Sequence, residues 1–263
     1  MPKIYGILVF CMMLCVGCQW KLKLNMNDGS TVAVIERYDR IEALYLTTGD
    51  FSALQKMNTG YPMETRTLIE DVLKIGKVND REINTRFLRF YQDSVLQAII
   101  SEVGQQYADM EDVSTEMQTA FDRLTDVLPG TEIPRIYTQI GSLDQSIIIT
   151  NNSLGICLDK YLGAGYPVYA RYYTEDQRRQ MERSMIVPDC LQFYILSMFP
   201  FPQSGRGDVQ RSCDVHIAKI QWVVNSLLKR KAYGGEQVDA VERYMKKHKN
   251  HSILQLLSDE IAL

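Results

Sequence analysis

Apolar residues recur at helical spacing over most of this chain, and that spacing limits the folds open to it. The longest run joins Phe87 to Val103 in one apolar stripe, on a helix predicted to begin near Asn79. The chain after Leu154 is also helical in pattern. Such stripes must be buried, so the chain has to pack several helices into a core. Shorter stripes of the same kind predict helices over residues 41–57, 62–75 and 113–128.

Two pairs of short stretches are predicted to be strands instead. Residues 21–25 and 31–35 alternate apolar and polar side chains around Asp28-Gly29, a dipeptide typical of a tight hairpin turn. Residues 133–140 and 146–150 are short and rich in β-branched side chains, and we expect them to be adjacent strands. The sequence therefore predicts an α+β fold, predominantly α-helical, in which a small mixed β-sheet packs with many helices.

The N-terminus is typical of an exported protein. A short positive start precedes residues 4–16, an apolar run that is too short to span a bilayer and matches the core of a signal peptide. Gly17 and Cys18 follow, and a small residue before a cysteine is typical of a bacterial lipoprotein cleavage site. We expect residues 1–17 to be a lipoprotein signal peptide, Cys18 to carry the lipid and residues 18–263 to form a single domain. Secretion without a lipid is the alternative.

A lipid at Cys18 would hold the protein to a membrane without a spanning helix. No acidic cluster follows Cys18, which favours a cell-envelope protein that faces the periplasm. The 29 Lys and Arg and the 32 Asp and Glu nearly balance, so no electrostatic feature indicates a nucleic-acid partner. Beyond the leader and Cys18, the cysteines are Cys157, Cys190 and Cys213, an odd count without a disulfide framework. One bridge, Cys190 to Cys213, is possible.

Few residues are suited to metal or thiol catalysis. His248 and His251 are three residues apart, but the lysines around them oppose a metal cation. A solvated basic helix end is the preferred interpretation. Cys213 and His216 lie one helical turn apart without a visible orienting group, which weakens the case for a thiol hydrolase.

The aspartates offer no clear acid–base pair either. Asp144, Asp159 and Asp189 would need a shared pocket, and the sequence shows none. Asp189 follows Pro188 and is interpreted as a helix cap. Asp159 and Lys160 are expected to face solvent or a neighbouring loop.

A cluster of tyrosines and arginines around Gly163 and Gly165 is the most promising surface. Tyrosine and arginine are the residue types that carry many protein interfaces, although several of these rings could instead fill the underside of the loop. The predicted interaction surface comprises Asp159, Tyr161, Tyr166, Pro167, Tyr169, Arg171, Arg178 and Arg179.

Several blocks of the chain, taken in order, resemble the gliding motility lipoproteins of the GldB type found in Bacteroidetes. No single block is a catalytic signature, so the likeness rests on their succession and on the lipoprotein leader. The blocks are residues 36–39, 87–93, 134–140, 154–163, 166–169, 178–181 and 186–189.

The resemblance implies an envelope lipoprotein with a fold related to zinc-dependent peptidases, whose active-site helix carries H-E-x-x-H. If Leu162-Gly163 ends that helix here, the two ligand positions fall on Ile156 and Lys160 and the general-base position on Cys157. Ile156 has no donor atom, a thiol is a poor base, and the Lys160 ammonium repels zinc. The resemblance therefore implies a degenerate motif, no enzyme activity and no cofactor.

The sequence thus favours a non-catalytic, membrane-tethered protein that acts through contacts with other envelope proteins or with motility and secretion machinery. The alternatives are a zinc-dependent, peptidase-like hydrolase with unusual ligands and a periplasmic ligand-binding protein.

Overall fold

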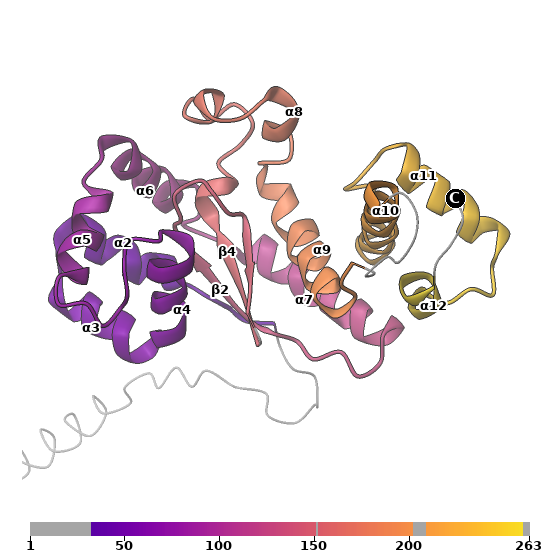
Figure 1. The fold of residues 1–263 in the computed structure, drawn as a ribbon, viewed down its shortest axis with the longest axis horizontal. Coiled ribbons are helices and arrows are strands. Elements are labelled where there is room, and N and C mark those ends of the chain that lie inside the picture. The colour runs from indigo at the N-terminus through magenta and orange to yellow at the C-terminus, as the bar shows by residue number, and fades with distance from the viewer. Residues whose placement is uncertain (1–32, 151, 202–208, 260–263) are drawn as a thin grey trace, which may run out of the picture. The chain divides into compact units, whose positions relative to one another are not determined.

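The computed structural model describes residues 33–150, 152–201 and 209–259, and Val32–Leu263 form one compact unit (Figure 1). It is mostly helical with one four-stranded sheet, which confirms the predicted α+β class. The elements in chain order are β1 (Ile35–Glu36), α2 (Tyr38–Thr48), α3 (Phe51–Gly60), α4 (Pro62–Thr67) with a π-helical turn (Leu68–Val72), α5 (Ile83–Tyr91), α6 (Ser94–Gln106), α7 (Glu111–Val127), β2 (Arg135–Gln139), β3 (Ile147–Ile149), β4 (Ser153–Cys157), α8 (Glu175–Arg178), α9 (Ile186–Met198), α10 (Val209–Leu228), α11 (Glu236–Lys247) and α12 (Ile253–Ser258).

The sheet has the strand order β1-β2-β4-β3. Strands β1, β2 and β4 run parallel, and β3 pairs with β4 in the antiparallel direction. The carboxyl ends of the three parallel strands therefore meet at one edge of the sheet, where ligand sites commonly form in sheets of this type. Residues that follow Glu36, Gln139 and Cys157 are brought together there.

The prediction that residues 133–140 and 146–150 form adjacent strands is wrong, because β4 lies between β2 and β3. The chain after Leu154 was expected to be helical, but residues 155–157 belong to strand β4, whose last four residues are buried. A run of buried side chains cannot be assigned to helix or strand by periodicity alone. Only a short connection separates β3 from β4 in the sequence, and antiparallel strands can be joined in this way.

The long helix predicted from Asn79 to Val103 is two helices, α5 and α6. The Asp93 side chain accepts hydrogen bonds from the backbone N–H groups of Val95 and Leu96 and so begins a new helix. Aspartate is a preferred N-terminal cap, and this cap overrides a continuous apolar stripe. Most of the stripe still faces the core, with Phe87, Ile99 and Val103 buried as predicted.

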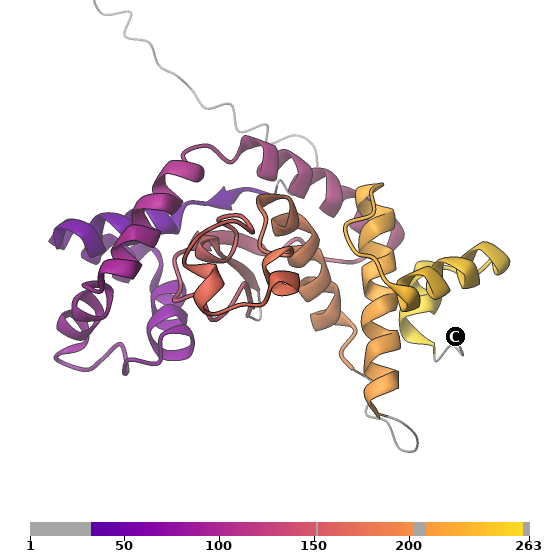
Figure 2. The ribbon, with the colours of Figure 1, turned by 90° about the horizontal axis from the view of Figure 1, so that it is seen from above.

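Helices cover the sheet on both sides. Helix α2 packs against β2, and α9 packs against β3 and β4, with α2 and α9 on opposite sides of the strands in Figure 1. Helix α7 also contacts α9. Figure 2 shows α10 beside α9 and followed by α11 and α12. The first turn of α9 and the carboxyl end of β4 therefore lie close together in the interior.

The predicted N-terminal hairpin falls mostly outside the described residues. Of its second strand, Ile35 and the following Glu36 form β1, and β1 pairs in parallel with β2. The predicted leader and Cys18 also lie outside the described residues. Within the part of the chain that the structure describes, no helix is long and apolar enough to cross a bilayer.

Candidate functional site

The stretch ICLDKYLG does not form the helix on which the peptidase motif was aligned. Ile156 and Cys157 end β4, and Leu158–Lys160 form a single 3-10 turn. Ile156, Cys157 and Lys160 therefore do not occupy ligand and base positions of one helix, and their assignment as degenerate motif positions is wrong. The likeness of the fold to zinc peptidases stays a prediction.

The predicted interaction surface is partly interior. Asp159, Tyr161 and Tyr169 are buried, so they cannot contact a partner directly. The Tyr169 hydroxyl donates a hydrogen bond to the Asp159 carbonyl at 2.5 Å and accepts one from the Leu162 N–H at 2.9 Å. Tyr169 therefore fills the underside of the loop. The other members lie at the surface: Tyr166 and Arg178 are half-buried, and Pro167, Arg171 and Arg179 are exposed.

Asp159 was expected to face solvent or a neighbouring loop, and it faces the loop after β2. Its Oδ1 accepts a hydrogen bond from the Gly141 N–H at 2.6 Å, and its Oδ2 accepts one from the Leu143 N–H at 2.7 Å. Burial raises the pKa of Asp159, and these two bonds to the carboxylate oppose that rise. The carboxylate therefore holds the loop after β2 against the turn after β4.

Two more carboxylates from α2 enter the same edge of the sheet. Glu42 Oε2 accepts the Ile140 N–H at 2.9 Å, and burial raises the pKa of Glu42 well above its usual range. Glu42 Oε1 has no hydrogen-bond partner among the described residues. Asp39 accepts two hydrogen bonds from the Arg37 guanidinium, both at 2.8 Å, and one from the Thr138 hydroxyl. These groups are engaged in holding the strand ends together.

The thiols are not placed for nucleophilic chemistry or for a bridge. Cys157, Cys190 and Cys213 are all free thiols, so the disulfide between Cys190 and Cys213 that the sequence allowed does not form in this structure. Burial raises the pKa of the Cys157 thiol well above its usual range, which keeps it protonated at neutral pH. His216 contacts the carbonyl of Phe199 at 2.7 Å rather than the Cys213 sulfur.

The other histidine pair, His248 and His251, contacts Tyr244. The His248 ring stacks on Tyr244 with centroids 4.2 Å apart, and His251 Nδ1 lies 3.0 Å from the Tyr244 hydroxyl. Among the described residues, no group of three or more His, Cys, Asp or Glu side chains is arranged to hold a metal ion.

A cavity of about 260 Å³ lies beside the strand edge, between the 3-10 turn, α8 and the first turn of α9. Tyr161, Asp189, Lys160 and Tyr173 are among the residues that line it. The Lys160 ammonium donates to the Leu143 carbonyl at 3.1 Å and sits 4.1 Å from the centre of the Tyr173 ring. The lining residues are Ser146, Lys160, Tyr161, Tyr173, Gln177, Gln180, Met181 and Asp189.

Asp189 is held by two tyrosines and is not a helix cap. Its Oδ2 accepts from the Tyr161 hydroxyl at 2.8 Å and its Oδ1 from the Tyr233 hydroxyl at 2.6 Å. Burial raises the pKa of Asp189, whereas burial lowers the pKa of Lys160. Charged groups shifted by burial and facing a cavity are typical of ligand sites. No local signal marks Tyr233, because the contact forms only through the packing of α9 and α10 with the turn after α10.

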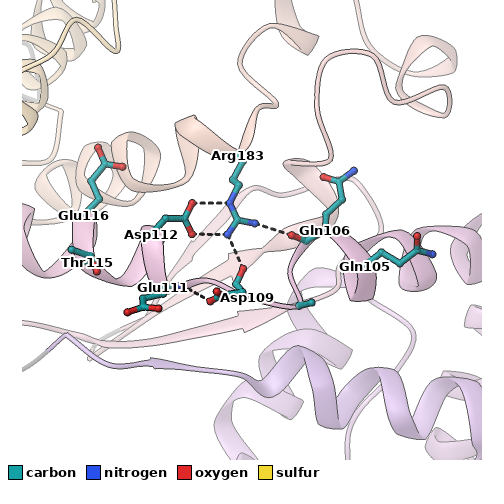
Figure 3. A pocket seen from close by; sticks show the side chains of 9 residues that line it. Gln105, Gln106, Asp109, Glu111, Asp112, Thr115, Glu116 and Arg183 are labelled. Atoms are coloured by element: carbon teal, nitrogen blue, oxygen red, sulfur yellow. Dashed lines mark hydrogen bonds and ion pairs between the residues drawn. The ribbon is translucent and has the colours of Figure 1, made fainter.

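A second hollow, of about 980 Å³, opens between the end of α6 and the start of α7 (Figure 3). Arg183 crosses it and donates to both Asp112 oxygens, at 2.7 and 3.0 Å. It also donates to the carbonyls of Gln106 and Asp109, at 2.9 and 2.7 Å. All of these bonds are internal, so Arg183 ties the segment before α9 to α6 and α7.

A comparison with protein-family models matches most of this chain. The model of the family described as gliding motility protein GldB matches residues 21–229, which include the sheet, the cavity and the Arg183 contacts. No curated protein matches the chain, and no solved structure does. Since the family model covers well over half of the sequence, the chain belongs to the gliding motility protein GldB family.

Proposed function

We propose that the protein is a lipid-anchored component of the cell envelope that acts without catalysis, through contacts with other envelope proteins. One observation carries the non-catalytic part. Asp159 stands where parallel sheets commonly place reactive groups, yet both of its oxygens bind backbone N–H groups at 2.6 and 2.7 Å. Asp159 is also fully buried, so its carboxylate supports the fold and is not exposed to a substrate.

The contact surface of this proposal is the exposed part of the segment between β4 and α9. It comprises Pro167, Arg171, Tyr172 and Arg179, and is called the α8 surface below. Tyr172 is 62% exposed, which is unusual for so large a ring. Exposed tyrosine and arginine side chains supply large contact areas and hydrogen-bond donors at protein interfaces. Tyr169 and Arg178 anchor this segment from below, through bonds to Asp159 and to the Ala164 carbonyl.

The membrane part of the proposal rests on the family and on the leader. A lipid at Cys18 would place the folded unit at a membrane surface, and we propose that it faces the periplasm. Contacts with membrane-bound or periplasmic proteins are then favoured, because both partners are confined near the same surface.

In-cell photocrosslinking tests the contact. A photoreactive phenylalanine analogue replaces Tyr172 in the full-length protein, and the matched control carries it at Phe51, which is 75% exposed on α3. We expect one defined adduct with an envelope protein from position 172 and none from position 51. The adduct should be lost when Arg171→Glu is added. Equal adduct patterns from both positions, or no adduct from position 172, would contradict the proposal.

Metal analysis tests the non-catalytic part separately. The full-length protein is purified in detergent without chelator and without a metal-affinity tag, and its zinc content is measured by mass spectrometry. We expect less than about a tenth of a zinc ion per chain. Stoichiometric zinc would overturn the non-catalytic assignment and support the peptidase-like alternative, provided that mutation of His, Cys, Asp or Glu side chains in the folded unit removes it.

A further inference from the structure

The cavity lined by Lys160 and Asp189 contains two charges of opposite sign that do not pair with each other. No salt bridge joins Lys160 or Asp189 to any described residue within the 4.0 Å limit of an ion pair. The carboxylates of Asp159, Asp144 and Asp189 act on the Lys160 charge from beyond ion-pair distance, so no close ion pair occupies its donors. Lys160 and Asp189 both line the same cavity.

Both groups retain hydrogen-bonding capacity toward the cavity. An ammonium has three N–H donors, and Lys160 directs one of them to the Leu143 carbonyl. A carboxylate can accept about four hydrogen bonds, and Asp189 accepts one on each oxygen, from Tyr161 and Tyr233. The Tyr hydroxyls fix the carboxylate, and the Tyr173 ring fixes the ammonium from 4.1 Å. The site is therefore preorganised on both sides, which reduces the entropy cost of binding.

We propose that this cavity binds a small zwitterion, an α-amino acid unit whose carboxylate contacts Lys160 and whose ammonium contacts Asp189. The volume of about 260 Å³ admits one such unit. Met181 and the ring of Tyr173 supply apolar lining, and Gln177 and Gln180 supply amide groups. The proposal does not depend on the α8 surface as a contact site, so either can fail without the other.

Two sources share this ligand chemistry. One is a free amino acid in the periplasm. The other is the zwitterionic end of a diaminopimelate side chain in a cell-wall peptide. The binding experiment includes both: free alanine, glutamate and lysine in one arm, and a diaminopimelate-containing tripeptide in the other.

Isothermal titration of the full-length protein in detergent measures the affinities. We expect one saturable site for at least one zwitterion, and much weaker binding of propionate and ethylamine, which carry only one of the two charges. Lys160→Met should weaken zwitterion binding at least tenfold and leave ethylamine binding unchanged. Asp189→Asn should weaken zwitterion binding at least tenfold and leave propionate binding unchanged.

Matched controls come from charges elsewhere on the surface. Lys77→Met removes an exposed partner of Glu70, and Asp239→Asn removes an exposed partner of Lys231. Neither Lys77 nor Asp239 lines the cavity. Both should bind as the wild type does, and unfolding curves establish that all four variants fold. Two results would overturn the proposal: no saturable binding by either arm at millimolar concentration, or equal weakening by the control and cavity variants. Recovery of the ligand chemically unchanged separates binding from turnover, so it tests the non-catalytic assignment independently.

Discussion

Tyr137 on β2 lies directly across Gly155 on β4, and only a glycine fits beneath its ring. The two residues are partners in the parallel pairing of β2 and β4. A Cβ atom on Gly155 would come within 2.6 Å of the Tyr137 Cζ and hydroxyl oxygen. Both residues are buried, so the ring has no room to move away. This contact explains a glycine in the middle of a strand, where it otherwise weakens the sheet.

The first prediction tests this close approach. Gly155→Ala should lower the free energy of unfolding by about 1–3 kcal/mol, because it overpacks a buried strand pair. Gly165→Ala is the matched control, since nothing lies within 4 Å of its Cβ position and its stability should not change. Urea unfolding measures both. If Tyr137→Leu restores part of the loss in a double variant, the ring is the cause; equal losses for the two glycine variants would contradict it.

The second prediction concerns the Asp159 connection between the strand ends. Asp159→Asn replaces one acceptor oxygen by an NH₂ group, which leaves the Gly141 or the Leu143 N–H unpaired in the interior. The expected loss is about 1–3 kcal/mol of unfolding free energy. Asp144→Asn, on the exposed part of the same loop, should have a much smaller effect. A wild-type denaturation midpoint for Asp159→Asn would mean that the two bonds contribute little.

The third prediction is a pH dependence that arises from Glu42. Burial raises its pKa in the folded state above the value of about 4.3 in an unfolded chain. A raised folded pKa means that Glu42 contributes its stability fully below the unfolded value and loses it as the pH rises through the folded value. Each pH unit in that window should remove up to about 1.4 kcal/mol.

Glu42→Gln removes this titration while keeping an oxygen for the Ile140 N–H. The free energy of unfolding, measured between pH 5 and pH 8, should fall less steeply with pH in the variant than in the wild type. The exposed Glu82→Gln variant serves as a control and should keep the wild-type slope. Identical slopes for the wild type and Glu42→Gln would show that Glu42 does not titrate in this range.

The fourth prediction concerns Arg183, which bridges α6 and α7 in Figure 3. Arg183→Ala removes the two-point contact with Asp112 and the bonds to the Gln106 and Asp109 carbonyls. Since the side chain is 31% exposed, solvent screening keeps the expected loss to roughly 1 kcal/mol. Arg179→Ala is the control, because it removes only an exposed ion pair with Glu175, four residues earlier. Its thermal unfolding midpoint should equal that of the wild type.

The fifth prediction tests the lipid anchor. Cys18→Ser removes the side chain that would carry the lipid, so the protein should move from the membrane pellet to the soluble periplasmic fraction. Cys213→Ser, which changes a thiol in the folded unit, should stay in the pellet. Retention of the Cys18→Ser variant in the membrane would sink the assignment of Cys18 as the lipidated residue.

The sequence by itself determined the class of the fold and the family. The apolar stripes predicted α7 well and marked residues 41–57 as helical, although the structure divides them into α2 and α3. The β-branched composition located β2 and β3. Both signals are local properties of the chain. The successive blocks of residues indicated the GldB family, which the match over residues 21–229 confirms.

Only the tertiary structure decided the strand order and which polar side chains are buried and with which partners. The strand β4 inserts between β2 and β3, an outcome that depends on pairing between distant segments and not on periodicity. Asp159 was included in the predicted interaction surface, yet it is buried because Gly141 and Leu143 offer two N–H donors that only the sheet brings near it. Asp189 meets Tyr233 for the same reason. The burial of a charge is set by the partners that packing supplies, and those partners are not adjacent in the sequence.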